Sequence, residues 1–426
     1  MLNIQQHQSP RLTRTINSPK CVCGGASLEL LLVLACARAA ICPESVGEIR
    51  QAVTQPVDFL KAIDLASCHR LAPCLIQQLL QHAAAALPES VVVEFRRWLR
   101  AHTLRSMQLT SQLVQILDRL KGHGIRALAF KGPVLAQQLY DQPFGREFED
   151  LDILVPTEAV DQVIALLGAD GFEAQFRLTS GQLTRFQKNW CEMALHDRAR
   201  NILVEIHWRL FPPGYSFSPA AETAWEATGE VLIAQRSIRT LSIENQLLFA
   251  CLHQAKHNWS RLGWLMDLAA LVKQSPQMDW EKVQYLAGRF GTARMIRVSL
   301  QLIQNFFEVA FPSAIKEWAE PDKQTESIAR RVEQRLLSAD PDAGERIRTD
   351  PFFRAAMESK HDRAVYWWQL ILRPTPLEWA LVPLPDWLWG LYYPVRAVRL
   401  LIKHAAGSLN ALYTRSRGTV ALTGGR

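Results

Sequence analysis

The sequence predicts an α+β protein, in which a short mixed sheet with helices is flanked by N-terminal and C-terminal helical regions. Alternating apolar residues predict strands at 127–130, 151–155 and 201–211. Apolar residues at helical spacing predict helices before and after this core. Hydrophobic residues make up 48% of the chain and charged residues 21%, which is typical of an ordinary folded protein.

Six segments follow from composition and pattern. The polar N-terminus predicts a disordered tail, and the next segment predicts helices at 91–99 and 108–120, ended by two glycines before the first strand. The six segments are a tail at 1–26, an N-terminal helical region at 27–122, an α/β core at 123–240, a helical lobe at 241–312, a helical, Trp-rich C-terminal region at 313–406 and a tail at 407–426.

The first strand of the core leads into Lys131-Gly132 and then into a helix predicted at 133–140. Pro133 suits the first helical turn. A glycine at this position lets a phosphate approach the backbone, and the N–H groups of a helix N-terminus attract anions. The turn is therefore a candidate phosphate-binding site.

Asp150 and Asp152 are two residues apart on the second predicted strand. Side chains alternate along a strand, so both carboxylates lie on one face, while Leu151 and Ile153 suit the core on the other face. Two neighbouring acids repel and favour a cation, for which we expect Mg²⁺ or Mn²⁺. Without a metal, we expect their pKa values to rise.

Glu205 and His207 share one face of the third predicted strand. If this strand lies beside the second, Glu205 completes a three-carboxylate site of the kind that holds two metal ions in phosphoryl transfer. His207 is also a candidate for substrate contact. The alternatives are that Glu205 is a solvated strand residue and that His207 is a structural histidine.

In the helical lobe, His253 and His257 are four residues apart and share a helix face. Together with Lys256 and Arg261 they are candidates for phosphate, metal or substrate contacts. The alternative is that this face is a packed seam between the lobe and the core.

These motifs resemble the bacterial uncharacterised nucleotidyltransferase family of the DNA polymerase β-like nucleotidyltransferase superfamily. The resemblance spans roughly residues 28–403. It rests on Phe130-Lys131-Gly132, Leu139-Tyr140, Arg146, the Asp150–Val155 segment, Glu205-Ile206-His207-Trp208, the His253–Leu268 segment, Pro374-Thr375, Leu391-Tyr392-Tyr393 and the Arg396–Leu400 segment.

The resemblance implies a polymerase β-like core and transfer of an NMP from an NTP, such as ATP, to an unidentified acceptor. It implies that Asp150, Asp152 and Glu205 hold the metal ions. Lys131 and the Gly132 N–H group would bind phosphate. Arg146 would steady the triphosphate or the acceptor. Two departures from the superfamily stand out: Lys-Gly replaces the usual Gly-Ser turn, and the third acid is Glu rather than Asp. The alternative is a non-catalytic nucleotide-binding or scaffold protein that retains the fold.

Charge and cysteine content limit the other possibilities. A net charge of +7 is mild for 426 residues, and the sequence has no basic-aromatic module, so we do not expect a nucleic-acid partner. The eight cysteines include no Cys-x-x-Cys pair, which favours free thiols in a cytoplasmic protein. The sequence predicts no transmembrane span. Residues 376–404 suit either peripheral membrane contact or a packed cap, and we favour the cap.

Overall fold

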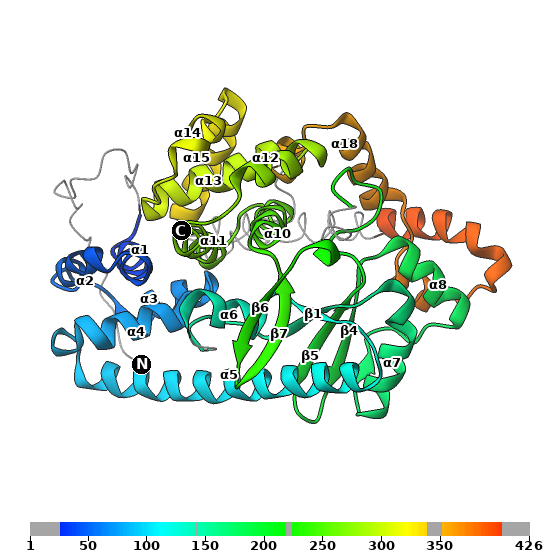
Figure 1. The fold of residues 1–426 in the computed structure, drawn as a ribbon, viewed down its shortest axis with the longest axis horizontal. Coiled ribbons are helices and arrows are strands. Elements are labelled where there is room, and N and C mark those ends of the chain that lie inside the picture. Colours follow the sequence, from blue (N-terminus) through cyan, green and yellow to red (C-terminus); the bar gives the residue numbers. More distant parts are fainter. Residues whose placement is uncertain (1–25, 142–143, 219–223, 339–351, 403–426) are drawn as a thin grey trace, which may run out of the picture.

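The structure, a computed structural model, describes residues 26–141, 144–218, 224–338 and 352–402. It confirms the predicted α+β class: a short mixed sheet with helices lies between an N-terminal and a C-terminal helical region (Figure 1). The two predicted tails, apart from residue 26, lie outside the described residues.

Four helices precede a much longer one in the N-terminal region. Side-chain caps begin α1 at Ser27 and α3 at Asp58, where each side chain accepts backbone N–H groups of the first turn. The helices are α1 (Leu28–Ile41), α2 (Val46–Ala52), α3 (Phe59–Cys68), α4 (Ala72–His82) and α5 (Glu89–Gly122).

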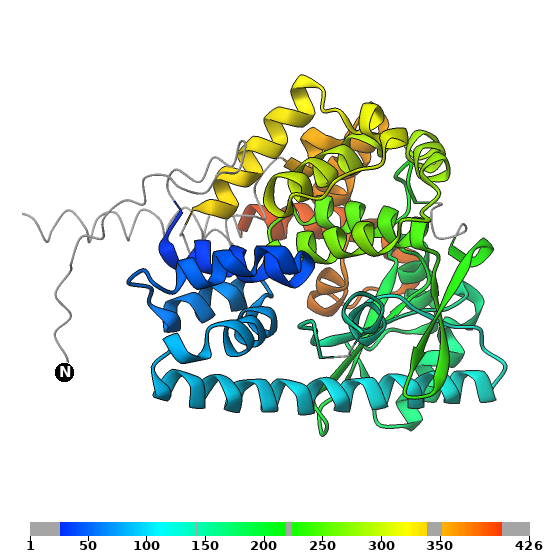
Figure 2. The same cartoon turned by 60° about the vertical axis from the view of Figure 1, so that its left-hand side comes forward.

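Helix α5 is one continuous helix of 34 residues. The prediction of separate helices at 91–99 and 108–120 is therefore wrong. The residues between them include neither Gly nor Pro, so nothing in the backbone ends the helix there. Figures 1 and 2 show α5 running along the molecule, under the N-terminal helices at one end and the sheet at the other.

The sheet has five strands in the order β1-β2-β5-β4-β3. β2 and β5 pair in parallel, and the other neighbouring strands pair antiparallel. The predicted strands are all present, although β1 and β5 are shorter than expected, and β4 was not predicted. The strands are β1 (Leu128–Ala129), β2 (Asp150–Leu154), β3 (Glu173–Ala174), β4 (Glu192–Asp197) and β5 (Ile202–His207).

Helices surround this sheet, and a separate hairpin follows it. The predicted helix after the Lys-Gly turn is α6 (Gly132–Tyr140). The remaining elements of the core are a 3₁₀ turn at Thr157–Ala159, α7 (Val160–Ala169), α8 (Ser180–Asn189) and the antiparallel pair β6 (Thr228–Ile233) and β7 (Arg236–Leu241).

The two faces of the sheet bury different cores. Leu151 and Ile153 of β2, with Val204 of β5, belong to a cluster that also contains apolar side chains of α5 and α7. Leu154 of β2 belongs to a second cluster formed mainly by the helices of the N-terminal region and the lobe. The acidic face of β2 is therefore the face turned toward the helical lobe.

The helical lobe and the C-terminal region complete the fold. The helices are α10 (Ile243–Lys256), α11 (Leu262–Gln274), α12 (Trp280–Arg289), α13 (Ala293–Phe307), α14 (Ser313–Ala319), α15 (Lys323–Leu337), α17 (Phe352–Ala356), α18 (Lys360–Trp367), a π-helical turn at Trp368–Leu372, α19 (Pro376–Leu381), a 3₁₀ segment at Asp386–Leu391 and helical residues 392–402. Within the described residues, no helix is both long and apolar enough to cross a membrane.

Candidate active site

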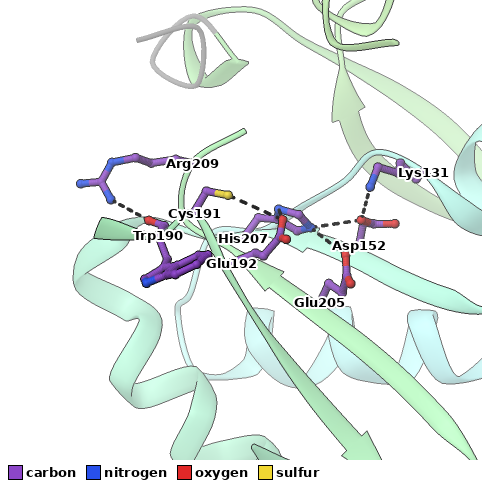
Figure 3. A network of polar contacts seen from close by, with 8 residues as sticks. All are labelled: Lys131, Asp152, Trp190, Cys191, Glu192, Glu205, His207 and Arg209. Atoms are coloured by element: carbon purple, nitrogen blue, oxygen red, sulfur yellow. Dashed lines mark hydrogen bonds and ion pairs between the residues drawn. The ribbon is translucent and has the colours of Figure 1, made fainter. Parts of the chain in front are cut away.

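The register of β2 and β5 brings the predicted acids onto one face. Asp152 lies directly opposite Glu205 in the parallel ladder, and His207 follows two positions along β5. The potential ligand atoms of Asp152, Glu205 and His207 all lie within 4.8 Å of one another. Figure 3 shows these side chains converging, as the alternation of side chains along each strand predicted.

Asp152 is buried between two cationic side chains. Its Oδ1 atom lies 2.6 Å from Lys131 Nζ and 3.1 Å from His207 Nε2 (Figure 3). Burial alone would raise the pKa of this carboxyl, but the charge of Lys131 and the hydrogen bond from His207 lower it. The expectation that its pKa rises without a metal is therefore wrong, because the chain itself supplies the positive charge.

His207 is held by three acids. Besides Asp152, its Nε2 atom lies 3.6 Å from Glu205, and its Nδ1 atom lies 3.2 Å from Glu192 on β4. Burial would lower the pKa of this imidazole, but hydrogen bonds to Asp152 and Glu205 raise it to about 9. His207 is therefore a cation at neutral pH in the absence of a metal.

Asp150 lies nearer the surface than Asp152 and has the opposite electrostatic character. Burial and the neighbouring charge of Asp152 raise the pKa of its carboxyl to about 6. The expected rise in pKa thus holds for Asp150. A bound cation would favour its ionised form.

The Lys-Gly turn has the geometry that a close approach to the backbone requires. Lys131 precedes the first turn of α6, and Gly132 has a φ of +51°, in the left-handed region. A Cβ atom on Gly132 would lie 3.1 Å from the carbonyl oxygen of Asp150. Only glycine fits this position without strain, so the turn and the acidic strand are built against each other.

Arg146 is held in place by a buried carboxylate. Its Nε atom donates to Asp267 of α11 at 2.7 Å, and Tyr140 donates its hydroxyl hydrogen to the other oxygen of Asp267 at 2.8 Å. Burial opposes the charge of Arg146, while Asp267 raises its pKa. This network connects the lobe to the core beside the acids.

His253, His257 and Trp264 form an aromatic cluster on the lobe. The two imidazole centroids lie 4.7 Å apart, and each ring contacts Trp264. Burial lowers both pKa values, that of His257 to about 4, so both rings are neutral at pH 7. Arg261 stacks over Trp264, with its guanidinium carbon 5.2 Å from the ring centroid. This face packs at the seam between the lobe and the core and also borders a cavity, so contact with a ligand stays a prediction.

A cavity of about 400 Å³ lies between the acidic face of the sheet and the lobe. Asp152 lies beneath its wall. Every other residue predicted for the site lines it: Lys131, Gly132, Arg146, Asp150, Glu205, His207, His253, Lys256, His257 and Arg261.

Glu192, Arg70 and Glu147 also line this cavity and were not predicted. Glu192 lies opposite His207 in the antiparallel pairing of β4 and β5. Arg70 bonds Glu147 at 3.0 Å. The alternating segment at 192–197, with buried Met193 and Leu195, was the signal that would have identified β4 and hence Glu192.

The donor set fits a divalent cation. Carboxylate oxygens are the ligands that Mg²⁺ and Mn²⁺ prefer. Asp152 and Glu205 bring theirs together beside His207, whereas Asp150 lines the cavity but is not part of this group. Asp152 Oδ2 is a buried acceptor that no hydrogen bond satisfies among the described residues. An unsatisfied buried carboxylate oxygen is costly, and coordination of a cation would satisfy it.

Comparison with known proteins gives one family match and two distant structural likenesses. The model of the family described as "Uncharacterised nucleotidyltransferase" matches residues 55–308, more than half of the chain. No protein with a curated function matches the sequence. Two similar solved structures are the antibiotic-resistance factor ANT(2'')-Ia and an antigenic nucleotidyltransferase-like protein from Paracoccidioides brasiliensis.

Both structural likenesses are distant. ANT(2'')-Ia is 14% identical with a TM-score of 0.28, over 43% of this chain and 92% of that one. The Paracoccidioides protein is 15% identical with a TM-score of 0.31, over 50% of this chain and 96% of that one. At these values neither supports a conclusion about this chain, and the assignment rests on the family match alone. The chain belongs to the uncharacterised nucleotidyltransferase family.

Proposed function

We propose that this protein is a metal-dependent nucleotidyltransferase that moves an NMP from an NTP to an acceptor. The observation that carries the proposal is the meeting of Asp152 and Glu205 on adjacent strands, where Glu205 lines a cavity large enough for a ligand and Asp152 is buried beneath it. Family membership supports the same reaction class. Free thiols at all six described cysteines suit the reducing cytoplasm, where NTPs are available.

In this proposal the acids hold the metal ion or ions. Asp150, Asp152 and Glu205 would be ligands of Mg²⁺ or Mn²⁺, which when bound neutralises charge on the phosphates and on the attacking oxygen. In the absence of a metal, protonated His207 lies between Asp152 and Glu192, so it would fix the orientation of Asp152.

The phosphates would lie toward the Lys-Gly turn. The Gly132 N–H group and Lys131 face the cavity beside the acids, and a helix N-terminus favours negative charge. Lys131 already bonds Asp152, so its ammonium group would be shared between that carboxylate and a phosphate. Arg146, fixed by Asp267, would contact the triphosphate or the acceptor.

The transfer itself is a single displacement. The acceptor oxygen forms a bond to the α-phosphorus, the bond from that phosphorus to the bridging oxygen breaks, and pyrophosphate leaves. Glu205, whose side chain is 25% exposed and lines the cavity, would take the proton of the acceptor hydroxyl. Positioning and electrostatics provide most of the rate enhancement in such reactions.

The test is incubation with each labelled NTP and Mg²⁺ or Mn²⁺, followed by measurement of metal-dependent NTP binding, pyrophosphate release and labelled product. We expect Glu205→Gln and Asp150→Asn to lower turnover by about 100-fold or more, since a metal ion supplies several kcal/mol of transition-state stabilisation. The matched control is Glu173→Gln, which changes an exposed carboxylate on β3 of the same sheet and should leave turnover unchanged.

Two outcomes would reject the proposal. Metal-dependent NTP binding without turnover under any condition would favour a non-catalytic nucleotide-binding protein. Turnover that Glu205→Gln and Glu173→Gln reduce equally would place the activity elsewhere.

A further inference from the structure

An unusual number of large apolar side chains lie exposed in residues 367–402. Most of the large apolar residues that the structure leaves exposed belong to this segment, among them Trp387 at 81% and Leu401 at 71%. We define the C-terminal patch by Trp368, Leu377, Leu381, Trp387, Val398 and Leu401. An exposed apolar surface of this size marks an interaction site more often than chance exposure.

The segments that carry the patch form one unit. Trp368 contacts Tyr393, with ring centroids 5.9 Å apart. Arg396 donates from its Nε atom to the carbonyl oxygen of Ile371 at 3.1 Å and also pairs with Glu378 of α19. The π-helical turn, α19 and the helical residues 392–402 are therefore held together, and they carry most of the patch.

Only the inner side of this unit is needed for the fold. Trp379 and Tyr392 are buried in the core cluster that contains β2, and Arg185 of α8 stacks over Trp389. Figure 1 shows these segments, in orange and red, beside α8. The predicted cap is thus present on the inner side. The exposed apolar residues belong to the outer side, which the cap does not explain.

The sequence that follows the patch favours an anionic partner. Within the patch segments, Glu378 is fully buried and pairs with Arg396 and Arg399, and Asp386 directly precedes Trp387. The sequence then continues through 403–426 with Lys403 and three arginines and with neither Asp nor Glu. Apolar and aromatic side chains followed by a purely basic segment form the two-part signal that membrane-surface proteins use.

We propose that the C-terminal patch binds the surface of a bilayer that contains anionic phospholipids. Trp side chains suit the polar–apolar boundary of a bilayer because their rings are apolar and their N–H groups polar. Leucine side chains of the patch would enter the acyl region, while the basic residues that follow in the sequence would add electrostatic attraction to anionic headgroups. This inference does not depend on the proposed reaction.

The test is cosedimentation of the full chain with vesicles of phosphatidylcholine alone and of phosphatidylcholine with phosphatidylglycerol. We expect binding to the anionic vesicles, weaker binding to the neutral ones, and weakening by salt. Replacing Leu381, Trp387 and Leu401 together by Ser should reduce vesicle binding about tenfold or more, because binding scales with buried apolar area. These side chains are exposed, so the variant should unfold at the parental urea concentration.

The matched control is Leu104→Ser combined with Met107→Ser, which removes two exposed apolar side chains from α5. This variant should bind vesicles like the parent. Absence of vesicle binding by the parent, or equal loss in both variants, would overturn the proposal. So would a parent that is dimeric without lipid and becomes monomeric in the patch variant, because a second copy would then be the partner. Vesicle binding that the patch variant retains would assign it to another surface and also overturn the proposal.

Discussion

Replacement of Asp152 by Asn tests how the site is held together in the absence of a metal. Asn keeps the size of the side chain but removes the charge that Lys131 and His207 share. Both cationic side chains are largely buried, so neither regains full hydration when its partner is neutralised. We therefore expect the variant to be less stable than the parent, even though Asn fills the same space as Asp.

The magnitude follows from the pKa of His207. A rise from 6.5 to about 9 corresponds to about 3 kcal/mol of stabilisation of the charged imidazole, at 1.36 kcal/mol per pKa unit. Glu205 and Glu192 contribute part of that rise. Breaking a buried pair with Lys131 adds to the loss, since removal of one partner costs about 3–5 kcal/mol in comparable cases. A loss of about 3 kcal/mol or more at pH 6 is expected.

The pH dependence has a definite sign. The pKa of His207 is higher in the folded state, so its contribution is complete below pH 6.5 and is lost as pH rises through 9. The pKa of Asp152 is lower in the folded state than its ordinary value of 3.8. Its contribution to stability is therefore present above that pH and is lost on acidification. The difference between parent and Asp152→Asn should therefore be largest between about pH 4 and 6.5. It should be smaller at pH 9, where the pair with Lys131 remains.

The assay is urea unfolding in EDTA at pH 6, 7.5 and 9. The matched control is Asp170→Asn, which removes an exposed partner of Arg119 and should cost no more than about 1 kcal/mol. Equal stability of Asp152→Asn and the parent at pH 6, or a difference that grows toward pH 9, would refute the assignment of His207 and Lys131 as the cations that balance Asp152.

Three further predictions concern the turn, the outer acid and the buried arginine. Gly132→Ala should destabilise the protein by about 1–2 kcal/mol. The alanine would have to adopt a left-handed backbone conformation, and its Cβ atom would lie against the carbonyl oxygen of Asp150. Gly168→Ala in α7, where a Cβ meets nothing within 4 Å, should be neutral or stabilising; urea midpoints that move together would contradict this reasoning. The affinity for Mn²⁺ should fall as pH decreases through about 6, because protons compete for Asp150, whereas an affinity constant from pH 7 to 5 would remove Asp150 from the ligand set. Asp267→Asn should cost about 3 kcal/mol by leaving Arg146 buried without its carboxylate, and thermal unfolding at the parental temperature would show that the pair is dispensable.

Local patterns were sufficient to predict the acidic face. Alternation along a strand is fixed by backbone geometry, so placing Asp150 with Asp152, and Glu205 with His207, required only that each segment be a strand. The sequence could not derive the pairing of β2 with β5, because strands far apart in the chain meet through the packing of the whole domain. That step came from the family resemblance, and the register then placed Asp152 opposite Glu205.

The partners of the site residues were the part that sequence could not supply. Lys131 was predicted to bind phosphate, and its position before α6 is as expected, but its bond to Asp152 depends on how β1 and β2 align. The alternation at 192–197 could have predicted the strand β4, but the pairing that brings Glu192 opposite His207 depends on the packing of the sheet. The continuity of α5 could have been predicted, since residues 100–107 contain neither Gly nor Pro to end the helix.

Two internal cations explain how neighbouring acids coexist in this fold before any metal binds. The sequence suggested that Asp150 and Asp152 need a divalent ion simply to lie together. In the structure, Lys131 reaches Asp152 from the turn before α6, and His207 reaches it from β5, so the innermost carboxylate is already balanced. Both of these contacts are made to Oδ1, which leaves Oδ2 unsatisfied. A metal ion is therefore not required to assemble the site, and the atom left for it to bind is one that the chain itself does not use.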